Sequence, residues 1–141
     1  MADKTTDELQ QELMAQPNIK AYLTENQDDF IEQGISEFLE ALLARCGLTK
    51  AEAARRSGMS EVYIHQVLSG RRNASRDRLL ALCVGLEASL EEAQQALRQG
   101  GYAQLYPRIR RDAIIIHGLV YHCGLQEIND TLFRANEKSL S

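Results

Sequence analysis

The sequence predicts an all-α fold. Residues that favour helix N-termini recur along the chain, each followed by apolar residues at helical spacing. Glycines stand where several of these segments end, and no segment of useful length alternates with the period of a strand. With 141 residues and an apolar fraction of 44%, the chain suits one compact domain with a tail.

The clearest local pattern is a pair of short helices in the middle of the chain. Thr49 is a good N-cap, and Glu52 stands three residues later, which completes a capping box. Gly58 ends the first helix, because glycine tolerates the left-handed conformation there. Ser60 caps the second helix, predicted over 61–68. Two helices joined by a tight turn with glycine predict a helix-turn-helix.

Caps, breakers and apolar spacing predict seven further helices. Pro107 suits the first turn of one of them, and Gly124 is expected to end that same helix. The helix that precedes the central pair is expected to start at Asp28 or Asp29. The approximate ranges are 3–16, 18–23, 28–46, 75–85, 89–98, 107–124 and 125–134.

Residues 35–97 resemble the lambda-repressor/Cro-like family of helix-turn-helix domains, also called the XRE type. The resemblance implies a five-helix repressor-like bundle over 28–99. An acidic helical extension over 1–27 precedes it, and two extra helices within 100–141 pack on it or mediate dimerisation. The resembling segments are ISEFLEALLARCG, LTKAEAARRSGMS, IHQVLSGRRNAS and LLALCVGLEASLEEAQQAL.

Charge is distributed unevenly along the chain, whose formal net charge is −4. Residues 1–44 hold two basic and ten acidic side chains, whereas residues 45–78 hold eight basic and three acidic ones. The positive charge therefore coincides with the predicted helix-turn-helix. Such a local field attracts a polyanion even when the whole molecule is acidic.

The resemblance implies that the second helix of the pair reads base edges in the major groove of DNA. The glutamine amide of Gln66 suits bidentate pairing with adenine, and Val62 suits contact with a thymine methyl group. Glu61 is a departure from the family pattern, because a carboxylate near phosphates is repelled. Ile64 and Val67 are expected in the core. The residues expected to contact bases are Ser60, Glu61, Val62, His65 and Gln66.

A cluster of cationic and polar residues flanks the reading helix and is expected to hold phosphates. Solvated loop residues are the alternative. A second group, Arg108, Arg110 and Arg111, has three open interpretations: a further phosphate patch, pairing with the acidic arm, or scattered surface charge. The expected phosphate contacts are Lys50, Arg71, Arg72, Asn73 and Arg76.

Metal, cofactor and enzyme sites are not predicted. Cys46, Cys83 and Cys123 are odd in number and widely separated, so we expect buried reduced thiols on helices rather than zinc ligands. No nucleophile–base pattern or phosphate-binding glycine loop is present. The polar N-terminus and the short apolar runs favour a soluble cytoplasmic protein.

The pattern predicts a sequence-specific regulator of transcription that binds double-stranded DNA, as a homodimer with two reading helices about 34 Å apart. The apolar stretch 113–121 is expected to serve as core and partly as a dimer contact. The alternative is a protein-interaction adaptor on the same fold. In that case the acidic arm would bind a protein partner or cover the basic face.

Overall fold

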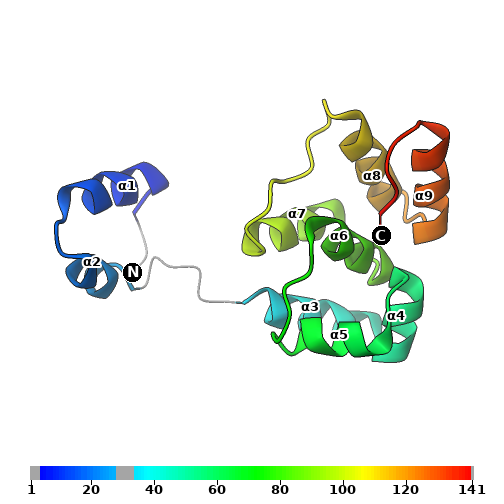
Figure 1. Ribbon diagram of the computed structural model, residues 1–141, viewed down its shortest axis with the longest axis horizontal. Helices are drawn as coiled ribbons and strands as arrows, with labels where there is room; N and C mark the ends of the chain where they lie inside the picture. The colour runs from blue at the N-terminus through cyan, green and yellow to red at the C-terminus, as the bar shows by residue number, and fades with distance from the viewer. Residues whose placement is uncertain (1–3, 28–33, 141) are drawn as a thin grey trace. The chain divides into compact units, whose positions relative to one another are not determined.

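The computed structural model describes residues 4–27 and 34–140, and within them every regular element is an α-helix. The chain divides into two compact units, Met1–Glu32 and Gln33–Ser141, shown in Figure 1. No helix in the described ranges is both long and apolar enough to cross a membrane. The helices are α1 (Thr6–Ala15), α2 (Ile19–Glu25), α3 (Ile35–Cys46), α4 (Lys50–Ser57), α5 (Glu61–Leu68), α6 (Arg76–Gly85), α7 (Leu90–Gln99), α8 (Arg110–Val120) and α9 (Leu125–Arg134).

The first unit is a pair of helices, α1 and α2, held together by a polar network. Asn18 caps α2 as predicted, and its side chain accepts hydrogen bonds from two backbone amides of the first turn. Asn26 is only 1% exposed and donates to a Glu12 carboxylate oxygen at 2.9 Å. Lys4 donates to both residues at 2.6 Å. Polar contacts therefore take much of the role that an apolar core has in a larger unit.

The second unit is built around α6. Every residue from Leu79 to Gly85 is buried, because α6 packs against α4, α7 and α9. An amphipathic pattern is not needed in a helix that is covered on all sides. In Figure 1, α5 lies along the lower edge of this unit and α8 near its upper edge, with α6 between them. Helix α8 packs on α7 and α9, with Ile115 and Leu119 buried.

The start of α3 differs from the predicted one, whereas its end does not. Gly34 is an extended N-cap, so this helix begins at Ile35. A start at Asp28 or Asp29 falls outside the described residues. The helix ends where predicted, at Gly47, which has a positive φ of 67°.

The boundaries predicted for α8 are wrong at both ends. Pro107 precedes the helix, which begins only at Arg110. The reason is a turn in which the Ile109 amide donates to the Tyr106 carbonyl at 3.0 Å, so the chain reaches helical geometry later. Gly124 does not end α8 but is the N-cap of α9.

Candidate nucleic-acid interface

Helices α4 and α5 begin with the caps that the sequence predicts. The Thr49 hydroxyl accepts from the Glu52 amide at 3.1 Å, and the Glu52 carboxylate accepts from the Thr49 amide at 3.1 Å. The Thr49 amide and hydroxyl group both donate to the Glu52 carboxylate, and these hydrogen bonds lower the pKa of that carboxyl group. Gly58 ends α4 with a φ of 67°, and the Ser60 hydroxyl caps α5 by accepting from the Tyr63 amide at 3.1 Å. Both helix starts are therefore rigidly defined.

Helix α5 has one buried and one open side. Its buried side consists of Tyr63, Ile64, Val67 and Leu68, which confirms that Ile64 and Val67 are core residues. Val62, on the other side, is 68% exposed. Among the predicted base contacts, Ser60, Glu61, Val62 and His65 are exposed and Gln66 is half-buried. Within the second unit, the outer side of α5 is thus available to a partner.

The arginine loop, residues 70–73, is fixed directly to the end of α5. The Gln66 carbonyl accepts from the amides of Arg71 at 2.9 Å and Arg72 at 3.2 Å. Gly70 has a φ of 81°, which permits this sharp reversal of the chain. Arg71, Arg72 and Asn73 are all exposed. One carbonyl therefore brings two cationic residues close to the end of α5.

Two guanidinium groups also lie over the ring of Tyr63. The Arg78 guanidinium carbon is 4.5 Å from the ring centroid, and that of Arg72 is 5.4 Å from it. Both distances are within the range of cation–π attraction. Tyr63 belongs to the first turn of α5, Arg72 to the loop and Arg78 to α6. The ring therefore links α5, the arginine loop and α6.

Lys50 is the first residue of α4 and is half-buried. Arg55 and Arg56 follow in the last turn of α4, and both are exposed. Arg56 lies 3.8 Å from Glu87, a long and solvent-exposed pair that contributes little. The surface around the helix-turn-helix therefore keeps the positive charge that the sequence concentrates there.

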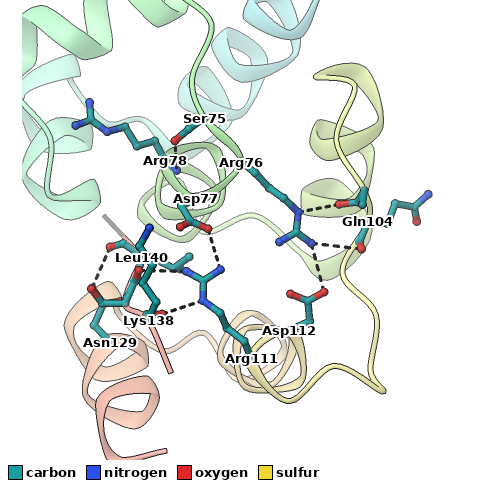
Figure 2. A network of polar contacts seen from close by, with 12 residues as sticks. Ser75, Arg76, Asp77, Arg78, Gln104, Arg111, Asp112, Asn129, Lys138 and Leu140 are labelled. Carbon is teal, nitrogen blue, oxygen red and sulfur yellow. Dashed lines mark hydrogen bonds and ion pairs between the residues drawn. The ribbon is translucent and has the colours of Figure 1, made fainter. Parts of the chain in front are cut away.

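Arg76 is directed away from α5, toward the C-terminal part of the unit. Its guanidinium donates to the Ala103 carbonyl at 2.9 Å and the Gln104 carbonyl at 3.4 Å. It also lies 3.3 Å from the Asp112 carboxylate, which is buried (Figure 2). These partners stand more than 25 positions away in the sequence. Arg76 is therefore omitted from the phosphate-binding set proposed below.

A second ion pair links the same two helices, but here the arginine belongs to α8 and the aspartate to α6. Arg111, at the start of α8, lies 2.9 Å from Asp77, at the start of α6 (Figure 2). The dipeptide Arg-Asp thus stands at the start of both helices, and each arginine meets the aspartate of the other. Arg111 therefore binds Asp77, instead of a phosphate or the acidic arm as two of the sequence-based interpretations had it. The two pairs hold the start of α8 against the start of α6.

We expect Asp77→Asn to lower the free energy of unfolding by about 1–3 kcal/mol, between the values for exposed and buried pairs. The matched control is Glu91→Gln. Glu91 is exposed and holds the same second position in α7 that Asp77 holds in α6. Glu91→Gln should lower the free energy of unfolding by only a few tenths of a kcal/mol, because it removes only the favourable helix-dipole interaction that both carboxylates make. Urea unfolding of the two variants makes the comparison, and equal losses would contradict a role for the pair.

The thiols are in different surroundings, and only one matches the prediction fully. Cys83 is buried in α6, and burial raises the pKa of its thiol to about 12. Cys46 and Cys123 are half-buried, and Cys123 lies after the end of α8 rather than on a helix. Across residues 4–27 and 34–140, no group of three or more His, Cys, Asp or Glu residues is arranged to hold a metal ion.

Residues 35–96 match a family model described as a helix-turn-helix domain. No curated protein and no solved structure matches the chain. The matched range runs from the first residue of α3 into α7, so it contains the α4–α5 pair and the arginine loop. This match is consistent with the lambda-repressor/Cro-like, XRE-type resemblance of the sequence.

Proposed function

We propose that this protein is a transcriptional regulator that binds double-stranded DNA sequence-specifically through α5. The observation that carries the proposal is the open outer side of α5 beside a loop whose arginines are already held in place. A helix with an exposed polar side fits the major groove, and flanking cations fit the phosphates on its edges.

Base recognition falls to the exposed side of α5. The Gln66 amide is the best direct reader, because it can pair with adenine through two hydrogen bonds. Val62 offers an apolar surface to a thymine methyl group, while His65 and Ser60 offer polar contacts. Glu61 accepts only from a donor such as cytosine N4, so it selects against other bases at its position.

Phosphate binding falls to Lys50, Arg71, Arg72 and Asn73. Arg71 and Arg72 directly follow α5, and Lys50 is the first residue of α4. In the proposed complex these two groups meet phosphates on the edges of the groove that α5 enters. With three phosphates neutralised per subunit by Lys50, Arg71 and Arg72, the logarithm of affinity should fall by about 2.7 per tenfold rise in salt. A homodimer doubles this slope.

We propose a homodimer that uses the incompletely covered side of α8. Ile109 and Val120 are 51% and 50% exposed, and they stand at opposite ends of one stripe of this helix. Ala113 and Ile116 lie between them and are only half-buried. An apolar stripe of this kind is suited to a second copy. Two copies would offer two reading helices to a site with two-fold symmetry.

Selection of bound duplexes from a random pool, at low and at physiological salt, tests both proposals. Recovered sequences should share a preferred motif. For a dimer, the motif should occur as two inverted half-sites one turn of duplex apart. Enrichment of no motif at either salt concentration would contradict sequence-specific recognition, and isolated half-sites would contradict the dimer.

We expect Gln66→Ala to relax the preference at one base pair by about 1–3 kcal/mol while leaving the other positions of the motif unchanged. Backbone contacts of Gln66 to the arginine loop survive the change, because they use its carbonyl group. Competition binding with single-base variants of the selected duplex measures the effect. Gln95→Ala, on the half-buried surface of α7, is the matched control and should change no position.

An adaptor function is the second candidate, favoured by the exposed carboxylate of Glu61 on the open side of α5. Deleting residues 1–26 separates the two. If the acidic arm competes with DNA for the basic surface, its deletion should raise the affinity for DNA several-fold, and more strongly at low salt. Absence of DNA binding in both the full and the shortened chain would favour the adaptor.

A further inference from the structure

The last described segment, residues 137–140, is held against the second unit as a strap. Arg111 donates to the carbonyl of Lys138 at 2.8 Å and to that of Ser139 at 3.1 Å. The Asn129 side chain accepts from the Leu140 amide at 2.8 Å and donates to the Leu140 carbonyl at 3.3 Å. Figure 2 shows the side chains of Arg111 and Asn129 directed at the strap. These four hydrogen bonds all use backbone atoms of the strap, so they do not depend on its side chains.

Among the four strap residues, one side chain is buried. Leu140 is only 1% exposed and belongs to the hydrophobic core, whereas Lys138 is exposed. Main-chain hydrogen bonds that supply affinity, together with one apolar pocket that supplies selectivity, are typical of sites for extended peptides.

The site is larger than the strap that occupies it. Leu140 lines one wall of a cavity of about 480 Å³, which lies within the usual size range of ligand pockets. Met59, Ser60 and Tyr63 contribute other parts of the wall, next to the turn between α4 and α5. The resident strap therefore leaves part of the groove unfilled.

We propose that this groove is a docking site for an extended peptide segment of a partner protein, with a leucine as its anchor and the strap as the resident competitor. The partner segment would take the four backbone hydrogen bonds and the leucine position, and would continue into the cavity. This inference does not depend on DNA binding. Because the strap is tethered, its effective concentration is millimolar, and a partner gains access when the strap is weakened or when its own segment fills the cavity.

Binding of a fluorescein-labelled peptide with the sequence of residues 135–141 tests the proposal by anisotropy. The Leu140→Ala chain should bind it saturably, and the unaltered chain at least roughly tenfold more weakly, because its own strap competes. Phe133→Ala, at a residue that is 80% exposed on α9, keeps the strap intact and should behave like the unaltered chain. A peptide with alanine in place of its leucine should not bind. Adding Asn129→Ala to the Leu140→Ala chain should abolish binding.

A second measurement avoids dependence on the folding of the Leu140→Ala chain. A peptide with a photoreactive leucine, at millimolar concentration, should crosslink to Met59 or Leu125 of the unaltered chain by exchanging with the strap. No crosslink there, or equal binding of the leucine and alanine peptides, would overturn the proposal. A change of oligomeric state in Leu140→Ala without any peptide binding would also overturn it, since the groove would then serve a second copy.

Discussion

We expect the double substitution Arg71→Ala/Arg72→Ala to weaken binding to every duplex by roughly a hundredfold, since each charged hydrogen bond to a phosphate contributes about 1.5 kcal/mol or more. Both side chains are exposed, so their removal leaves no buried group unpaired. Phosphates are the same at every base pair, and the loss should therefore be uniform across sequences. The salt slope should become shallower by about two per subunit. Titrations at several salt concentrations measure both effects.

The matched control removes two exposed arginines from elsewhere on the same unit. Arg98 stands at the end of α7 and Arg134 at the end of α9, and both are exposed. Arg98→Ala/Arg134→Ala changes the net charge by the same amount and should alter affinity only through the general field. An equal loss in both double variants would show that charge alone, and not the position of the loop, determines binding.

Gly85→Ala should have the largest effect on stability, because α4 and α6 meet at this glycine. A β-carbon there would lie 2.3 Å from the Ser57 hydroxyl oxygen, 3.2 Å from the Ser57 backbone nitrogen and 3.3 Å from the Arg56 carbonyl carbon. Side-chain rotation cannot relieve the contacts with the backbone of α4, so the two helices must separate. We expect a loss of about 3 kcal/mol or more in the free energy of unfolding, at the upper end of overpacking effects.

Thermal unfolding measures this loss, which should appear as a decrease in Tm of about 10 °C or more. Gly124→Ala is the control, since a β-carbon at Gly124 meets no atom within 4 Å and its φ of −73° suits any residue. Its cost should stay below about 1 kcal/mol. Adding Ser57→Ala to Gly85→Ala should recover part of the loss, because the closest contact disappears. No recovery would show that the backbone contacts alone decide the outcome.

The sequence predicts the helix-turn-helix well because its determinants are local. The capping box of Thr49 and Glu52, the left-handed Gly58 and the cap at Ser60 each depend on residues within one turn. The apolar spacing of α5 also places Ile64 and Val67 in the core. Short-range hydrogen bonds and periodicity are visible in a single chain without any knowledge of its tertiary contacts.

Contacts between distant segments explain what the sequence did not predict. Arg76 resembles a member of the arginine loop because it follows Arg72 closely, but Asp112 and two carbonyls from residues 103 and 104 bind it. The signal that could have found this pairing is the repeated Arg-Asp dipeptide at the starts of α6 and α8. The late start of α8 has a similar cause, since Asp112 also accepts from the Tyr106 amide at 3.0 Å.

The crossed pairs between α6 and α8 have a practical consequence for anyone who shortens this protein. A fragment cut after residue 99 keeps all of residues 35–96, yet it strips Arg76 and Asp77 of the partners that hold them. Arg76 and Asp77 would then lack their ion-pair partners, and both stand only a few residues after the loop that carries Arg71 and Arg72. A minimal fragment for binding studies or for grafting onto another protein should therefore extend through Leu140.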